Sequence, residues 1–430
     1  AGSSDRISPT ISARLGSTTG SSESRSPPTS SDTMHPPKWL GVLKGTLSIV
    51  IEKQTQGGRP IRRGMERIPM ARPSWEKEMR DAALATLDSK QWVKGTQVAG
   101  FGKEFADYCG VLGATPCQNG SSALWAALRI AGIGPGDEVI VPSFTFISST
   151  TCVLLVGAKP VFVDIEPDYF CLDVQKVKQA ITTDTKAVIG VHLFGQTYSS
   201  ELVELCRKEN LVLIEDAAQA HGARQTFANG GERIAGAMGD IGCFSFFPSK
   251  NMAVGGEGGM LTTTKPQFQD RIVGITNHGR SPDLEAIQLG SNLRMSEVSA
   301  SIGRIQLLSL DKWLELRRHN AAEFTKALMN HPTLTAPKVR PKSKHAWHQY
   351  CVQTTEPGRF ISHLDVLGID ARRYYSTPCH QQQVYSEHPQ HNSTLVNTDK
   401  AANTLVAIPV MHALTETERN RIIEALVSFN

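Results

Sequence analysis

Apolar and polar residues along the chain alternate with two different periods, which predicts helices interleaved with strands. Apolar residues at helical spacing predict helices over roughly 75–89, 118–132, 173–182 and 199–209. Short apolar runs, "DEVIVPS", "KPVFVDI", "KAVIGVHLFG" and "LVLIEDA", predict buried strands in the same part of the chain. Strands that alternate with helices of this length are typical of a mostly parallel sheet covered on both faces. The predicted fold class is therefore α/β.

A long amphipathic helix is predicted over roughly 296–328, and the sequence pattern changes after it. A proline-bounded segment near 335–341 follows it, and the short elements beyond are typical of an α+β arrangement. We therefore expect a large α/β/α domain over residues 65–310 and a smaller C-terminal α+β domain over residues 311–430.

Residues 1–64 form an extension of unusual composition. The first 33 residues contain eleven serines and few apolar residues, so burial cannot offset the entropy of ordering them, and disorder is expected. A serine-rich, arginine-containing start is also typical of an organelle import signal. The simpler interpretation is that the natural protein starts at Met65. The apolar piece "WLGVLKGTLSIVI" is interrupted by Lys44 and is too short to span a bilayer.

Charge and cysteine content argue against several classes of function. The net charge is +4, but residues 1–64 carry nine basic and four acidic residues, which leaves 36 basic and 37 acidic residues elsewhere. A near-neutral folded part has no electrostatic footprint for nucleic acid. Eight cysteines without a C-x-x-C pair or zinc-ligand spacing indicate reduced thiols in the cytoplasm. We expect no nucleic-acid, membrane or metal partner.

The segment "FSFFPSKNMAVGGEGG" places Lys250 just after a predicted buried strand. In open α/β sheets, ligands bind where the strands end. A lysine without context is usually a surface charge, but an amine held among apolar groups loses its proton more readily, because desolvation disfavours the ammonium form. Lys250 is therefore a candidate for Schiff-base chemistry.

A carboxylate follows another buried strand, because "LVLIEDAAQAHGA" places Asp216 at the strand end and Gln219 in the next turn. Alone, Asp216 would be interpreted as a helix cap. Beside a strand-end lysine it has a second interpretation, since a carboxylate keeps the pyridine nitrogen of pyridoxal phosphate protonated. Lysine and carboxylate together favour this cofactor.

A candidate phosphate site begins the helix in "QNGSSALWAALRIAG", where Gly120, Ser121 and Ser122 offer N–H groups and a helix dipole to an anion. Ser245 can add a hydroxyl, and the ring of Phe146 can lie flat on a pyridine ring. Each of these residues alone is more typical of a cap or of core packing. The histidines of "HAWHQY", at 345 and 348, are expected to pack or to border a substrate and not to bind metal.

In combination these motifs resemble the DegT/DnrJ/EryC1/StrS family of sugar aminotransferases, which are fold-type I enzymes that use pyridoxal phosphate. The resemblance covers nearly the whole chain from Ile68 to the C-terminus, with its segments in family order. They include "NGSSALWAAL", "PGDEVIVPSFTF", "IEDAAQAHGA", "GDIGCFSFFPSKNM", "GSNLRMSEVSASIGRIQL" and "GIDARRYYSTPCHQQQVY".

The resemblance implies a role for each candidate residue. Lys250 would form the Schiff base with the cofactor, and Asp216 would hold its pyridine nitrogen. The other cofactor-binding residues that it implies are Gly120, Ser121, Ser122, Phe146, Gln219 and Ser245. Asn292 would reach into the cofactor site of the partner subunit of a homodimer. Tyr375 and His380 would bind the sugar.

The implied reaction moves an amino group from an amino acid, with glutamate as the expected donor, to a keto sugar. The leading acceptor is a nucleotide-linked 4-keto-6-deoxy hexose, and the alternatives on the same scaffold are a 3-keto sugar, a cyclitol ketone or an aminoshikimate-type ring. An aldolase without cofactor would explain Lys250 but not Asp216. A catalytically silent regulatory or binding homologue is the alternative from another class, and the presence of both residues argues against it.

Overall fold

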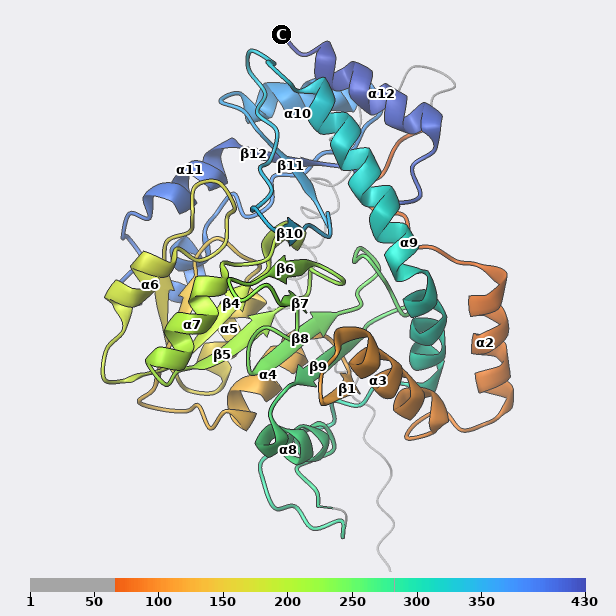
Figure 1. Ribbon diagram of the computed structural model, residues 1–430, viewed down its shortest axis with the longest axis vertical. Helices are drawn as coiled ribbons and strands as arrows, with labels where there is room; N and C mark the ends of the chain where they lie inside the picture. The colour runs from red at the N-terminus through yellow and green to blue at the C-terminus, as the bar shows by residue number, and fades with distance from the viewer. Residues whose placement is uncertain (1–65, 282) are drawn as a thin grey trace, which may run out of the picture. The chain divides into compact units, whose positions relative to one another are not determined.

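A seven-stranded sheet lies at the centre of the protein (Figure 1). The computed structural model describes residues 66–281 and 283–430. The strand order is β1-β9-β8-β5-β4-β2-β3, and β9 runs antiparallel to both of its neighbours, whereas β8, β5, β4, β2 and β3 are parallel. The strands are β1 (Gly113–Cys117), β2 (Glu138–Pro142), β3 (Lys159–Val163), β4 (Thr185–Val191), β5 (Val212–Asp216), β8 (Ile241–Ser245) and β9 (Gly259–Thr263). The predicted, mostly parallel α/β sheet is confirmed.

Both faces of this sheet are covered, because successive strand residues point to opposite faces. Val139 and Ile189 pack on one face with α4 (Gly120–Ile130) and α5 (Ser148–Leu155). Their chain neighbours Ile140 and Val188 pack on the other face with α6 (Val174–Ala180) and α7 (Ser200–Lys208). A strand that is buried on both faces has apolar residues at successive positions. Such strands are therefore continuous apolar runs in the sequence, which is why they could be predicted.

A single long helix, α9 (Glu297–Ala327), connects the sheet region with the C-terminal elements (Figure 1). It packs against α2 (Lys77–Asp88) and α3 (Thr96–Cys109) and also contacts α12 (Glu416–Val427). The helix predicted over 296–328 is thereby confirmed. The domain boundary predicted between residues 310 and 311 falls inside α9, and the division into two domains stays a prediction.

The remaining elements are short. They are α8 (Pro266–Thr276), α10 (Pro357–Val366), α11 (Val396–Thr404), the three-stranded sheet β6 (Arg224–Thr226), β7 (Glu232–Ile234) and β10 (Ser343–Lys344), and the hairpin-like pair β11 (Tyr350–Gln353) and β12 (Leu405–Ile408). Of the segment "HAWHQYCVQT", only the last four residues before Thr354 form a strand, β11. The preceding residues leave the ladder because the N–H groups of Ala346 and His348 donate to the carbonyl groups of Gly195 and Phe194, both at 2.9 Å.

Several sequence expectations concern what surrounds this fold. Within residues 66–281 and 283–430, no helix is long and apolar enough to cross a membrane. The eight cysteines are all buried and free, in agreement with the predicted reduced thiols. The extension predicted over residues 1–64 lies outside the described residues.

Glu215 is fully buried on β5 and joins the sheet to the turn that precedes β8. Its carboxyl oxygens accept hydrogen bonds from the N–H groups of Gly236, Met238 and Gly239 at 2.9, 2.8 and 2.6 Å, and His192 Nε2 lies 2.7 Å away. Buried donors without a partner cost stability. One carboxyl group therefore holds three backbone N–H groups and the ring of His192 beside the strand end that carries Asp216.

We predict that Glu215→Ala lowers the free energy of unfolding by about 3–5 kcal/mol, because it leaves these donors unpartnered around a new cavity. Urea unfolding followed by tryptophan fluorescence measures the loss. Glu209→Ala, at an exposed position after α7, is the control and should change stability by no more than about 0.5 kcal/mol. A loss below about 1 kcal/mol for Glu215→Ala would contradict the central role of this carboxyl group.

Candidate active site

A cavity of about 1170 Å³ lies at the carboxyl ends of three neighbouring strands. Val191 ends β4, Asp216 ends β5 and Ser245 ends β8, and all three residues line it. Such strand ends are where α/β sheets bind ligands. The N-terminus of α4 and the segment after β2 complete one side, and residues 374–377 and 381–383 close another.

Lys250 reaches this cavity from the turn after β8, where its N–H donates to the carbonyl group of Phe247 at 2.8 Å. Burial lowers the pKa of its amine from the ordinary 10.5 to about 8, and the nearby charge of Asp216 opposes part of this shift. The amine is therefore still mostly protonated at physiological pH, but its neutral form is far more abundant than that of an ordinary lysine. This confirms the effect that the sequence position of Lys250 predicted.

Asp216 holds the opposite side of the cavity floor. One carboxylate oxygen accepts a hydrogen bond from the hydroxyl of Ser149 at 2.6 Å, and the other accepts from the N–H of Ala218 at 3.2 Å. Although Asp216 acts on the charge of Lys250, no ion pair joins the two side chains in this part of the chain. Amine and carboxylate thus face one cavity without neutralising each other directly.

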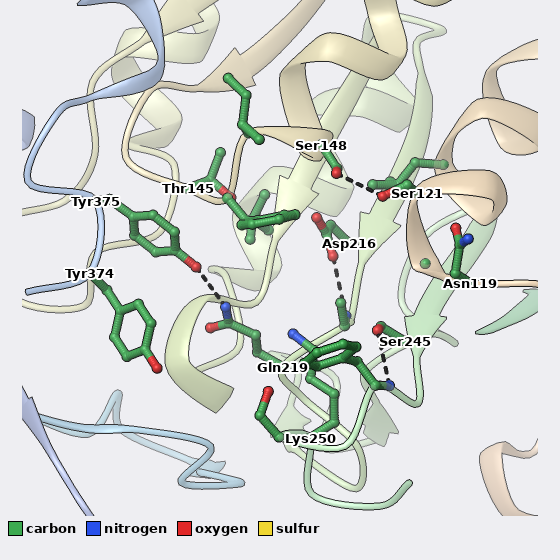
Figure 2. A pocket seen from close by; sticks show the side chains of 18 of the residues that line it. Asn119, Ser121, Thr145, Ser148, Asp216, Gln219, Ser245, Lys250, Tyr374 and Tyr375 are labelled. Carbon is green, nitrogen blue, oxygen red and sulfur yellow. Dashed lines mark hydrogen bonds between the residues drawn. The ribbon is translucent and has the colours of Figure 1, made fainter. Parts of the chain in front are cut away.

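The N-terminus of α4 forms one end of the cavity (Figure 2). Asn119 caps this helix, accepting a hydrogen bond from the N–H of Ser122 at 2.8 Å. The N–H groups of Gly120 and Ser121 remain free of such a cap. At Gly120 a Cβ atom would lie 2.9 Å from the Cβ atom of Ser245, so a larger residue would close this end of the cavity. Free N–H groups at a helix start attract an anion.

Hydroxyl groups surround the same end. The side chain of Ser121 donates to that of Ser148 at 2.7 Å, and Ser245 lies across from them (Figure 2). Phe146 lines the cavity with 55% of its surface exposed, and Phe247, which also lines it, is 46% exposed. An exposed ring of this kind can cover the face of a planar ligand.

Three predicted site residues do not line this cavity. Ser122 uses its N–H in the cap of α4. Asn292 is exposed and pairs by a backbone bridge with Asn277. His380 is fully buried with its Nδ1 2.5 Å from the hydroxyl of Ser143 and its Nε2 3.0 Å from the carbonyl oxygen of Ser393. His380 therefore does not reach the cavity in this structure, and the roles of His380, Ser122 and Asn292 stay predictions.

The structure also adds residues that the sequence did not single out. They are Thr145, Ser148, Tyr374, Gln381, Gln382 and Gln383, which line the cavity, and Ser149, which holds Asp216. Of the two histidines expected to pack or to border a substrate, His348 lines the cavity and His345 does not. Burial and then the charge of Lys250 lower the pKa of His348, so it is neutral.

Comparison with known proteins agrees with this geometry. The sequence profile of the DegT/DnrJ/EryC1/StrS aminotransferase family matches residues 73–427. The chain belongs to this family. Among its relatives in this aminotransferase family, the dTDP-3-amino-3,4,6-trideoxy-alpha-D-glucose transaminase of Streptomyces venezuelae is 37% identical over 80% of this chain and 90% of the relative. The GDP-perosamine synthase of Caulobacter vibrioides is 36% identical over 84% of this chain and 98% of the relative.

A solved structure shows the same fold for this aminotransferase. The crystal structure of S. venezuelae DesV in complex with a ketimine intermediate superposes with a TM-score of 0.80 at 34% sequence identity, covering 84% of this chain and 98% of that chain. The fold-type I architecture expected from the sequence motifs is therefore confirmed.

We predict that the amine of Lys250 in this aminotransferase reacts with acetic anhydride with a midpoint near pH 8, because only the neutral amine is nucleophilic. Competitive labelling of ligand-free protein, read by mass spectrometry of its peptides, measures the midpoint. Lys103 serves as the control, since its hydrogen bond with Asp107 raises the pKa of its amine above 10.5. Equal midpoints for the two lysines would contradict the desolvation of Lys250.

Proposed function

We propose that this aminotransferase uses pyridoxal phosphate to move an amino group from an amino acid to a nucleotide-linked keto sugar. The observation that carries the proposal is the placement of Lys250 and Asp216 in one cavity without an ion pair between them. A buried amine and a buried carboxylate would normally pair. Their separation fits a planar ring that bonds to Lys250 and whose protonated nitrogen donates a charged hydrogen bond to the carboxylate of Asp216.

The residues present fit the remaining parts of this cofactor. Gly120 and Ser121 offer free N–H groups at the start of α4 to a phosphate, and the hydroxyl of Ser245 lies at the same end. Phe146 supplies an exposed ring to cover one face of the pyridine. Gln219 lines the cavity between Asp216 and Tyr375 and can reach an oxygen of the ring.

When bound, pyridoxal phosphate supplies an electron-withdrawing ring that stabilises negative charge on the carbon atom from which a proton is removed. Lys250 Nζ is the group that would hold the cofactor covalently. As a neutral amine it would carry the proton between the amino-acid Cα and the cofactor side. Because the pKa of this amine is about 8, the fraction in the neutral, basic form increases as the pH rises through 8.

Asp216 keeps the pyridine nitrogen protonated, because its carboxylate stabilises the positive charge of that N–H group. The hydroxyl of Ser149 donates to one carboxylate oxygen of Asp216 at 2.6 Å, and this bond also fixes the orientation of the second oxygen. In the second half of the reaction, the keto sugar takes up the amino group and Lys250 moves the same proton in the opposite direction. Glutamate is the proposed donor.

The proposed acceptor follows from the relatives and from the polar wall of the cavity. Perosamine synthase and the trideoxyglucose transaminase are both named for nucleotide-linked sugars, and the second name places the amino group at carbon 3. Gln381, Gln382 and Gln383 bring amide groups to the lining of the cavity, where hydroxyl groups of a sugar can bind. We keep the 4-keto-6-deoxy hexose as the leading acceptor, with the 3-keto sugar as the second candidate.

A homodimer is part of this proposal. Asn292 is exposed and does not line the cavity of its own chain, which leaves it available to a second copy. An antiparallel backbone bridge with Asn277 holds the main chain of Asn292 in place. The proposed role of Asn292 is a contact with the cofactor site of the partner subunit.

We predict that Lys250→Ala folds but loses transaminase activity by about 10³-fold or more, because the proton carrier is gone. Borohydride reduction with pyridoxal phosphate should add the cofactor mass to the peptide with Lys250 in the unchanged protein and to no peptide of the variant. Lys208→Ala, on an exposed lysine of α7, is the control and should keep full activity. Full activity of Lys250→Ala would overturn the assignment.

We also predict which acceptors work. A nucleotide-linked 4-keto or 3-keto hexose should be aminated with a kcat/KM at least about tenfold above that of the free keto sugar, because the nucleotide adds binding energy. Mass spectrometry of the products, with glutamate as donor, measures both. Amination of a cyclitol ketone and of no nucleotide sugar would overturn the sugar assignment and leave the cofactor assignment intact.

A further inference from the structure

The side-chain amide of Gln219 is held in one orientation. Its Oε1 atom accepts a hydrogen bond from the backbone N–H of Phe194 at 2.7 Å, and its Nε2 atom donates to the hydroxyl of Tyr375 at 2.8 Å (Figure 2). A backbone N–H can only donate, so the oxygen of the amide must face Phe194. The amide cannot flip without losing this bond. One N–H of Nε2 is used by Tyr375 and the other is left for the cavity.

Tyr375 is itself held firmly in place. Its ring packs edge-on against Phe144 at 5.6 Å and stacks on Phe194 at 6.2 Å with an angle of 15° between the rings. Both Tyr375 and Phe194 have left-handed backbone conformations, with φ of 60° and 58°. Residues other than glycine keep such conformations only where the surrounding structure determines them, and they gather at functional sites.

The hydroxyl of Tyr375 acts as the acceptor in its hydrogen bond with Gln219. Burial raises the pKa of this hydroxyl above its ordinary value, so the group stays neutral. It accepts from Gln219 through an oxygen lone pair, which leaves its own hydrogen free. Tyr374, the neighbouring residue, also lines the cavity, but its hydroxyl does not contact Gln219 in Figure 2.

We propose that Tyr375 is a positioning residue that fixes the amide of Gln219 with one N–H directed at the ring oxygen of pyridoxal phosphate. The proposal rests on the proposed function, and it changes the role of Tyr375 from the sugar contact expected from the sequence. Through this bond a residue beyond β11 sets the hydrogen bonding of a residue next to β5. The sugar side and the cofactor side of the cavity are thereby linked.

The consequence concerns the acidity of the bound cofactor. An N–H donor at the ring oxygen stabilises its negative charge, and loss of that donor favours the protonated form. Without the hydroxyl of Tyr375, the amide of Gln219 keeps its bond from the N–H of Phe194 at Oε1 but loses its partner at Nε2. The amide plane can then tilt about the oxygen, so that the second N–H of Nε2 is no longer directed at the ring oxygen. The pH at which the visible absorbance band of the bound cofactor titrates should then rise.

The test is a pH titration of that band in holoenzyme variants. We expect Tyr375→Phe and Gln219→Ala each to raise the midpoint by about one unit, the size expected for loss of one hydrogen bond to a charged group. Gln219→Ala should also weaken cofactor binding by about tenfold, measured by equilibrium dialysis. Tyr374→Phe is the matched control, because it also removes a tyrosine hydroxyl, but one that does not bond to Gln219. It should leave the midpoint unchanged.

A double-mutant cycle separates positioning from a direct effect. If Tyr375 acts through Gln219, then adding Tyr375→Phe to Gln219→Ala shifts the midpoint no further. Additive shifts, or an unchanged midpoint in Tyr375→Phe, would overturn the proposal. Gln219→Glu tests the same geometry if Tyr375→Phe does not fold, since its carboxylate cannot donate to the ring oxygen, and an unchanged midpoint there would also overturn it. Unchanged protein that binds no pyridoxal phosphate would instead refute the proposed function.

Discussion

The separation of Lys250 from Asp216 is the constraint on which the site depends. Both side chains line one cavity, and each charge acts on the other, but no ion pair forms within the described residues. Direct pairing would raise the pKa of the amine toward its ordinary value and occupy the carboxylate. With the pair held apart, burial dominates and the pKa of Lys250 falls to about 8. A usable base and a free carboxylate therefore result from the same spacing.

The mixed sheet produces this spacing. Asp216 ends β5, and Lys250 lies in the turn after the parallel neighbour β8, so the two residues approach from adjacent strand ends. The antiparallel strand β9 then begins at Gly259, where a Cβ atom would lie 2.5 Å from the backbone carbon of Asn119. A glycine at this point lets β9 pass against the start of α4, which brings the N–H groups of that helix to the same cavity. The strand directions and the glycine at position 259 thus place an amine, a carboxylate and the N–H groups of a helix start at one cavity.

Much of this could be predicted from the sequence, because parallel buried strands are long apolar runs and their ends are marked by the first polar residues. Lys250, Asp216 and Ser245 were found in that way, and so was α9 from its helical period. For His380 the motif shows only that a polar ring is near the site. It does not show that the two ring nitrogens bond to Ser143 and Ser393. The bond from Ser149 to Asp216 joins side chains 67 positions apart, and local pattern does not report such pairs.

The distribution of charge in the cavity gives the proposed homodimer a physical reason. Among the described residues that line it, the charged ones are Lys250, Asp216 and Glu257, and no arginine is present. The free N–H groups of α4 are assigned to the phosphate of the cofactor. A nucleotide diphosphate carries further negative charge that amides such as those of Gln381 and Gln382 can contact but not neutralise. In the proposed homodimer, a cation of the second copy could balance that charge, and Asn292 is exposed at the surface where such a contact is proposed.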